Sequence, residues 1–427
     1  MPVLRVIAGA VVLLLLTPSI SQSQQPAELS LSPAVASAQA RHPSIAAALL
    51  AAEAAGSRAA QAGKWANPEL NVSQENFPGT LAGANQWIVS LSQRIRLGGQ
   101  LGRSSDLEST HQRALSNDAE AVRREIGLHV EREYSAGYAY QQHLEVVIGT
   151  IASANSLMRD MEARLVEEDV SAYEVMRLRR EVDALNVRAV NLRSDHGKVS
   201  IRLAALTGIG VPAAGWAFAM PEGQPGGPPP VTADAAGPRD SSNDTRGVGG
   251  ADLGRRPDVE AAVERQRAAG QAEELARKQA IPDLVLTAGY SHLDPGLDGF
   301  VWSVGLTLPV FDRRTDDAAA LQVEQARWDR QVASLKVEAE AQREQARRGY
   351  VDATQALQRM GTGTETDLAP VARLAYEEGA MSVMEFVDAL RTDLEARSTR
   401  IELERQRSVQ WFEWRWAIGE ERQGDSQ

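Results

Sequence analysis

The stretch that decides the fold is Pro282–Phe311, with the sequence PDLVLTAGYSHLDPGLDGFVWSVGLTLPVF. Apolar residues alternate with polar or small ones before and after the loop LDPGLDG, and each run carries an aromatic residue close to that loop. A period of two on both sides of a Gly- and Pro-containing loop predicts a β-hairpin. Long stretches rich in Ala and charged residues flank it, and these are typical of helices.

The whole arrangement occurs twice in the chain. A constant offset of 215 residues relates the apolar positions of one hairpin strand to those of the other: Trp87, Val89 and Leu91 to Trp302, Val304 and Leu306. In each half one proline opens a helix pattern and another, 25 residues later, opens a strand: Pro43 and Pro68, then Pro257 and Pro282. A repeat of this length indicates two halves of one architecture, not a short-period solenoid.

The beginning of the chain is typical of an exported protein. Residues 1–22 contain Arg5, an apolar run and then small residues, which predicts a cleaved signal peptide and a mature chain starting near Gln22–Gln25. There is no Cys in the 427 residues, so neither a disulfide framework nor a lipid-accepting Cys is expected. The net charge of −12 argues against nucleic-acid binding and suits a surface that tolerates cations.

The composition shifts predict the division of the chain. We expect a first repeat at residues 23–207, with a hairpin at 68–96 and a tip turn at 166–176. A Pro- and Gly-rich linker at 208–252 is expected to wrap around the outside or to be disordered. The second repeat follows at 253–419, with its hairpin at 282–311 and its tip at 377–388, and a polar tail occupies 420–427.

Each repeat contains one very long helix pattern. These patterns run from Gly98 to Leu165 and from Arg313 to Tyr376, which at 1.5 Å per residue is about 100 Å of helix. We expect a kink or break in the second one, at Pro370 and the GTGT sequence of 361–364. The shorter helices Ala172–Leu206 and Val383–Ile418 would match the long ones in length only if each stacks end to end with the short helix of the other repeat.

Several segments together carry a family resemblance. ANPELNVSQENF and SLSQRIRLGGQLG in the first repeat, with RRPDVEAA and VGLTLPVFDRR in the second, resemble the TolC-like outer membrane efflux family, most closely its CzcC and CusC type cation efflux branch. The resemblance implies a mainly α protein with membrane β. Its two-repeat protomer would contribute a long α-helical coiled-coil tunnel and four strands of a trimeric, twelve-stranded outer-membrane β-barrel.

The resemblance also implies a function. The chain would be a passive homotrimeric conduit in the outer membrane of a Gram-negative bacterium, with a large periplasmic part, carrying metal cations or drugs. Its partners would be a periplasmic membrane-fusion adaptor, an inner-membrane resistance-nodulation-division pump and outer-membrane lipid. Type I protein secretion stays open, since the outer component alone does not set the cargo. A periplasmic coiled-coil scaffold or adaptor without a barrel is the alternative of another class.

Physical reasoning supports oligomerisation independently. Four strands of about ten residues can cross an outer membrane but cannot close a barrel, and open sheet edges are not tolerated in lipid. Four aromatic residues would then lie at the membrane interface: Trp87, Tyr290, Phe300 and Trp302. The polar or Gly- and Pro-rich loops Phe77–Asn85 and His292–Gly299 would face outside the cell. A soluble hairpin that buries these aromatics is the alternative.

The sequence gives little support to an enzyme. The six His residues are dispersed, and none forms the i, i+4 pair of a helical zinc site, so neither a metal site nor a cofactor is expected. Gly98, Gly99 and Gly102 lie between a strand and a helix, as in a phosphate cradle. We interpret them instead as the residues that let the chain turn from barrel to tunnel.

The second tip is the candidate pore constriction. Gly379 matches the glycine that opens this turn in the TolC family, so the resemblance gives Tyr376 a place in the closing network and Glu385 and Asp388 places at the constriction. Glu385 and Asp388 are three residues apart, on one helix face, and threefold symmetry would make them a ring of six carboxylates. An ordinary solvated face, with a charge pair to Arg391, is the alternative.

One tip position departs from the family pattern. The residue two after the glycine is often an arginine that ties the tip shut, and here it is Met381. The first tip offers Glu174 and Arg177 at the same spacing, and Arg177 is the candidate substitute for the missing arginine.

Overall fold

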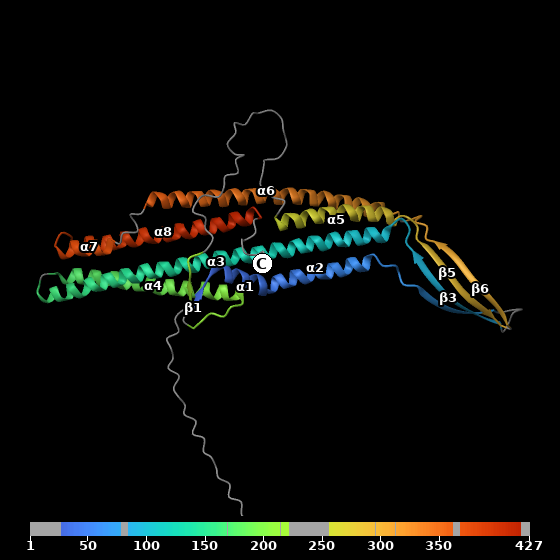
Figure 1. Cartoon of the computed structure of the whole chain (residues 1–427), viewed down its shortest axis with the longest axis horizontal. Coiled ribbons are helices and arrows are strands. Elements are labelled where there is room, and N and C mark those ends of the chain that lie inside the picture. Colours follow the sequence, from blue (N-terminus) through green and yellow to red (C-terminus); the bar gives the residue numbers. More distant parts are fainter. Residues whose placement is uncertain are drawn as a thin grey trace, which may run out of the picture.

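The structure, a computed structural model, describes residues 27–77, 84–168, 170–213, 215–221, 256–294, 296–311, 313–361 and 368–419. The predicted signal peptide and its cleavage site, most of the linker and the polar tail lie outside these residues. Long helices run side by side over most of the molecule, and a single sheet extends from one end of them (Figure 1). No helix in the described ranges combines the length and the apolar character needed to cross a membrane.

The first repeat contributes helices α1 (Leu31–Arg41), α2 (Pro43–Ala62), α3 (Gln100–Val166) and α4 (Ala172–Thr207). α3 has 67 residues, or about 100 Å at 1.5 Å per residue, close to the predicted length. Both α2 and α4 pack against α3, α2 toward the sheet and α4 toward the far tip (Figure 1). Proline occupies the first position of α2. It fits a helix start because the backbone N–H that proline lacks would have no intrahelical partner there.

The second repeat contributes α5 (Pro257–Gln279), α6 (Thr315–Met360), α7 (Leu368–Glu377) and α8 (Val383–Ala417). The predicted break in its long helix is confirmed, because α6 ends at Met360 and Gly361 adopts a left-handed φ of 63°. Pro370 falls in the first turn of α7, where a missing N–H costs little.

The stacking of the shorter helices differs from the prediction. α2 shares its row with α4, and α5 shares its row with α8, so each short helix stacks with a partner from its own repeat, not from the other one (Figure 1). Both members of a pair pack on the same long helices: α2 and α4 on α3, and α5 and α8 on α6 and also on α3. Length matching alone could not decide between the two arrangements.

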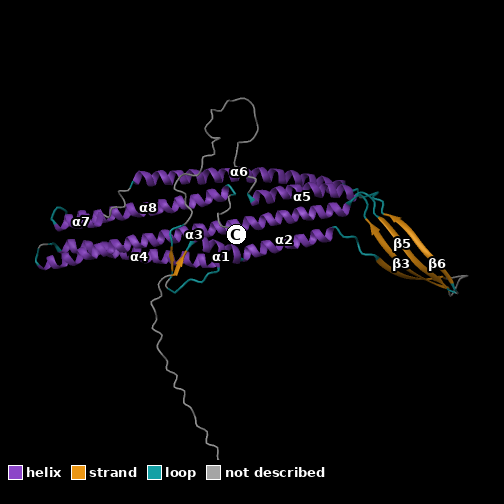
Figure 2. Cartoon of the chain, viewed as in Figure 1, coloured by secondary structure: helices purple, strands orange, loops and turns teal. Residues whose placement is uncertain are grey.

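Strands β2 (Glu69–Phe77), β3 (Ala84–Ile95), β5 (Leu284–Leu293) and β6 (Leu297–Leu306) form one antiparallel sheet in the order β2-β3-β5-β6 (Figure 2). The two hairpins are joined through β3 and β5, in a register that pairs Val89 with Tyr290. The predicted fold class, mainly helical with four strands, is confirmed.

The segment after α4 corrects the prediction of an external or disordered linker for its first residues. Trp216–Phe218 forms β4, which pairs in parallel with β1 (Ala27–Leu29). The Trp216 and Phe218 side chains are buried, and the Tyr134 hydroxyl donates to the Leu29 carbonyl at 2.6 Å. The segment is held as part of the largest apolar core, midway along the helices.

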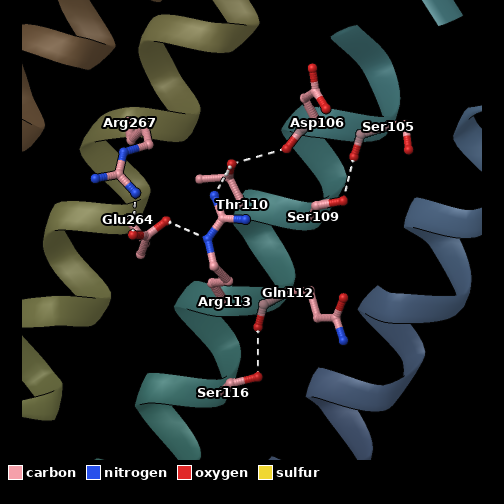
Figure 3. Close-up of polar contacts among 9 residues, drawn as sticks. All are labelled: Ser105, Asp106, Ser109, Thr110, Gln112, Arg113, Ser116, Glu264 and Arg267. Carbon is pink, nitrogen blue, oxygen red and sulfur yellow. Dashed lines mark hydrogen bonds and ion pairs between the residues drawn. The ribbon is translucent and has the colours of Figure 1, made fainter. Parts of the chain in front are cut away.

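Small side chains and ion pairs hold the helices together. Buried alanines recur along α2, α3, α5 and α6, which lets the helix backbones approach closely. Between the repeats, Arg113 of α3 donates to Glu264 of α5 at 3.0 Å, and Glu264 also accepts from Arg267 (Figure 3). Ion pairs at the surface add little stability. These pairs therefore fix the register of α3 against α5 more than they strengthen the packing between the two helices.

Candidate functional site: the sheet and the helical tip

The sheet has one apolar and one polar face. The strand pairing places on one face the side chains Leu70, Val72, Trp87, Val89, Leu91, Leu284, Leu286, Tyr290, Phe300, Trp302, Val304 and Leu306. Phe300 and Trp302 are 91% and 78% exposed. No element of the described chain covers this face, and an exposed apolar surface of this size marks contact with lipid or protein.

The opposite face carries mainly small and polar side chains: Ser73, Ser90, Ser92, Thr287, Gly289, Ser291, Ser303 and Gly305. The Ser92 and Thr287 hydroxyls are 2.9 Å apart, and the Gln86 amide donates to the Ser291 hydroxyl at 2.7 Å. These bonds join the two hairpins on the side that a closed barrel would turn toward its lumen.

The four predicted interface aromatics all lie on the apolar face. Tyr290 and Phe300 are direct partners across β5 and β6, with ring centroids 6.2 Å apart in an edge-to-face arrangement. Trp87 lies opposite His292, nearer the loops, and Trp302 lies opposite Ala288, nearer the helices. At about 3.3 Å per residue the two tryptophans differ in depth by about 13 Å, so they do not form one thin belt.

Gly98 and Gly99 make the turn from sheet to helix. Both have left-handed φ values, 79° and 73°, and Gly99 is the residue that precedes α3. A Cβ on Gly98 would lie 2.6 Å from the Ile281 Cδ1, so the end of that side chain would have to shift. The turn from sheet to helix is therefore made by these two glycines, whereas Gly102, predicted to share the role, lies inside α3.

At the opposite end of the helices, Glu385 begins α8 as part of a capping box. Its carboxylate accepts from the Ser382 backbone N–H and hydroxyl, both at 2.8 Å, and its own N–H donates to that hydroxyl at 3.3 Å. These hydrogen bonds lower the pKa of Glu385 below its usual range. The bond from the Ser382 N–H is the larger cause and the bond from the Ser382 hydroxyl is the smaller one. Glu385 is therefore a fixed, ionised carboxylate, and Asp388 is exposed on the same helix one turn later.

Glu174 has the same role at the start of α4. Its carboxylate accepts from the Ser171 backbone N–H at 3.0 Å and from its hydroxyl at 2.9 Å. Arg177 lies one turn further along and is partly exposed. The two tips therefore repeat one local structure, in which a Ser and a Glu three residues apart open a helix.

Tyr376 is buried within the protomer, not on the exposed face that carries Glu385 and Asp388. Its ring lies 6.3 Å from the Phe386 ring, and the Arg164 guanidinium lies 5.8 Å from its centroid. Met381, which stands where the family often has an arginine, packs against the same apolar cluster. Gly379 has a φ of 72°, as the tip turn requires.

Two arginines connect the repeats near the tip: Arg373, which the sequence analysis missed, and Arg391, for which it considered only Asp388 as a partner. Arg373 of α7 donates to Ser156 at 2.6 Å and to Asp160 at 3.1 Å, both on α3. Arg391 of α8 donates to Glu181 of α4. Arg391 thus binds the other repeat through Glu181, and Asp388, the partner considered from the sequence, adds only a weaker charge attraction. No pattern within either repeat could have shown contacts between residues so far apart in sequence.

Within the described part of the chain, no three His, Asp or Glu side chains are placed to hold a metal ion. His143 and His196 are half-buried on the helices, and burial is the main cause that lowers the pKa of each. His196 packs edge-on against Phe218, with centroids 5.2 Å apart. These features are structural and suggest no chemistry.

The comparisons with known proteins agree with this arrangement. Residues 250–420 match the family model described as outer membrane efflux protein. The matched stretch takes in the second repeat. This match agrees with the resemblance found in the sequence and with the predicted outer-membrane location. The family consists of efflux proteins, not of enzymes.

Relatives and solved structures extend the likeness beyond the second repeat. A nickel-cobalt-cadmium resistance protein, NccC, from Alcaligenes xylosoxydans xylosoxydans is 24% identical over 69% of this chain and 64% of its own length, which is less than two thirds. Crystal structures of CusC share the fold with a TM-score of 0.68 and 18% identity, over 94% of this chain and 96% of that one. The crystal structure of the Campylobacter jejuni outer membrane channel CmeC has a TM-score of 0.71 and 15% identity, over 91% of this chain and 85% of that one.

Proposed function

We propose that this protein is a passive trimeric conduit from the periplasm to the exterior, acting as the outer component of a tripartite efflux system. The observation that carries the proposal is the sheet, which exposes a continuous apolar face and ends in two unpaired edges, β2 and β6. A four-stranded sheet with an apolar face in water is a liability, and in lipid its edges must be paired.

Closure by identical copies satisfies these edges. β6 runs from the loops toward the helices and β2 runs the opposite way, so β6 of one copy can pair antiparallel with β2 of the next. Strands of 9 to 12 residues, tilted as in known barrels, span the outer-membrane hydrocarbon. Three copies would make the twelve-stranded barrel, and the loops at 77–85 and 292–299 would face outside.

The helical rows support the same assembly. In the protomer the rows follow in the order α2 and α4, α3, α5 and α8, α6 (Figure 1), while α7 packs on α8 and contacts α3 near the tip. Large apolar side chains are exposed on the two outer rows and on α7: Leu49, Leu50, Val187, Val190 and Ile201 on α2 and α4, Val323 and Val337 on α6, and Val371 and Leu374 on α7. Adjacent copies would bury these side chains against each other.

For the cargo we propose metal cations, with drugs as the other class. NccC is named for resistance to nickel, cobalt and cadmium, and this chain carries a net charge of −12. Glu385 and Asp388 of three copies would add a ring of carboxylates that concentrates cations at the tip and repels anions. An adaptor and an inner-membrane pump would supply the energy for export through this passive conduit.

Purified full-length protein in detergent and in planar bilayers tests the proposal. We expect a trimer by light scattering and discrete conductance steps. As a control, Trp302→Asp together with Val304→Asp, on the apolar face, should abolish insertion, whereas Ser303→Asp on the polar face should still insert. A monomer that forms no channel, as expected for the scaffold without a barrel, would contradict the proposal.

A further inference from the structure

Basic and large apolar side chains lie at the level where the sheet joins the helices, and this level is called the belt. The chain crosses it four times, at residues 63–68, 96–99, 280–283 and 307–314. Side chains tie the crossings together: the Gln93 amide donates to the Ala66 carbonyl at 2.9 Å, and the Gln100 amide donates to the Lys278 carbonyl at 3.1 Å. The four crossings therefore lie at one level, which Figure 1 shows at the right-hand end of the helices.

Basic side chains gather at this belt. Five of them have no carboxylate within ion-pair distance among the residues that the structure describes: Lys64, Arg94, Arg96, Lys278 and Arg313. Nearby cations do find partners, as in the pairs Arg103–Glu274 and Arg277–Glu273. In a chain with a net charge of −12, this gathering of cations at one level points to an anionic ligand.

Large apolar side chains lie beside two of these cations. Trp65 follows Lys64 and is 60% exposed, and Phe311, two residues before Arg313, is fully exposed. Val310 is exposed as well. Aromatic and apolar side chains next to basic ones are typical of the boundary between headgroups and acyl chains.

These two groups flank the two open edges of the sheet. Lys64 and Trp65 come just before β2, and Phe311 and Arg313 come just after β6. The register puts Glu69 level with Ser303, through Ser92 and Thr287, so the start of β2 and the end of β6 lie at the same height. When β6 of one copy pairs with β2 of the next, the two groups come together at the seam.

We propose that each seam between two copies binds the headgroup of an anionic phospholipid of the periplasmic leaflet. Lys64 of one copy and Arg313 of the next would neutralise the phosphate, while Trp65 and Phe311 would lie beside the first acyl carbons. This inference rests on the proposed function, because only barrel closure joins the two edges. A soluble anion would use the two cations but would leave Trp65 and Phe311 in water, so the apolar pair favours a lipid.

Native mass spectrometry of the full-length trimer with phosphatidylglycerol or phosphatidylcholine tests the site. We expect up to three phosphatidylglycerol molecules per trimer, and weaker binding of phosphatidylcholine. Replacing both cations, Lys64→Gln with Arg313→Gln, should weaken phosphatidylglycerol about 30-fold, about fivefold for each charge. Lys64→Arg with Arg313→Lys should keep the binding, and soluble glycerol phosphate should not compete.

A matched control removes the same two charges elsewhere. Lys336 and Arg330 are exposed on α6, about 20 Å or more along the helix from the belt, so Lys336→Gln with Arg330→Gln should leave lipid binding unchanged. Equal phosphatidylglycerol binding by both double variants, or no preference over phosphatidylcholine, overturns the lipid site. A wild-type trimer that conducts in pure phosphatidylcholine yet shows no preference for phosphatidylglycerol refutes the lipid site and leaves the proposed function intact. A chain that forms no trimer refutes the proposed function as well.

Discussion

The Arg391 Nε on α8 donates to the carboxylate of Glu181 on α4 over 3.0 Å, although the residues are 210 positions apart. The Glu181 side chain is buried, whereas that of Arg391 is about half exposed. The pair therefore joins the shorter helices of the two repeats near the tip, and one of its charges depends on the other for solvation.

Replacing Arg391 with Gln should loosen the tip. Glu181 would keep its buried position without its charged partner, which costs about 1–3 kcal/mol. Hydrogen exchange measured by mass spectrometry should show faster exchange in both α4 and α8 around these residues. Arg180→Gln is the control, since Arg180 is exposed and has no ion pair within the described chain. Unchanged exchange in Arg391→Gln, or no recovery when Glu181→Gln is added, would contradict this role.

The hairpins and the long helices could be predicted because they are periodic over many residues. Alternation in Pro282–Phe311 defines strand faces, and a duplicated pattern defines two repeats. The three-residue strand at Trp216–Phe218 carries no such pattern, and its partner lies almost 190 residues earlier, at Ala27–Leu29. A Pro- and Gly-rich composition therefore concealed an ordered, buried segment.

The candidate site was predictable to a similar degree. The spacing of Glu385 and Asp388 put both on one helix face, but it could not show that Glu385 is engaged by Ser382. The sequence S-x-x-E before an apolar run is the signal that could have shown it. Tyr376 was placed by resemblance alone, and its burial depends on packing with Phe386 that no local pattern reveals.

The capping box makes the start of α8 sensitive to acid. Because folding lowers the pKa of Glu385 below 4.5, its stabilising effect is complete above that pH and is lost as the pH falls through the folded value. Hydrogen exchange in the first turn of α8, corrected for intrinsic rates, should show this loss as the pH falls below 4.5.

Ser382→Ala removes the hydroxyl but keeps the backbone N–H, so it should weaken this pH step and reduce protection of that turn about fivefold even at neutral pH. The first repeat supplies the control, because Ser171→Ala breaks the matching box at Glu174 and should affect α4 but not α8. If Ser382→Ala kept the same pH profile as the wild type, the box would not be the cause.

Gly137 is needed where α3 passes Phe218. A Cβ at this position would lie 2.7 Å from the Phe218 Cζ, inside the largest core. Gly137→Ala should displace the ring and destabilise the β1–β4 pair by about 1–3 kcal/mol. Limited proteolysis after residue 215 should accelerate accordingly.

Gly149 on the same helix provides a matched control. Nothing lies within 4 Å of a Cβ there, so Gly149→Ala should be neutral or stabilise α3 by about 0.5–1 kcal/mol. Equal proteolysis rates for the two variants would show that Phe218 can move aside at no cost.

The final prediction concerns the carboxylates at the tip. Replacing Glu385 with Gln and Asp388 with Asn in every copy keeps the side-chain shapes and removes two negative charges per chain. If these groups form a ring, the preference for cations over anions should fall by a factor on the order of three, because charges around a narrow opening act on each passing ion. Reversal potentials in a potassium chloride gradient across a planar bilayer measure this preference, and block by multivalent cations should weaken in parallel. Asp183→Asn with Glu395→Gln is the matched control, because both residues are exposed, on α4 and α8, further from the tip. Selectivity that drops equally in both double variants would reflect total charge alone, and selectivity unchanged in the first would place Glu385 and Asp388 away from the pore.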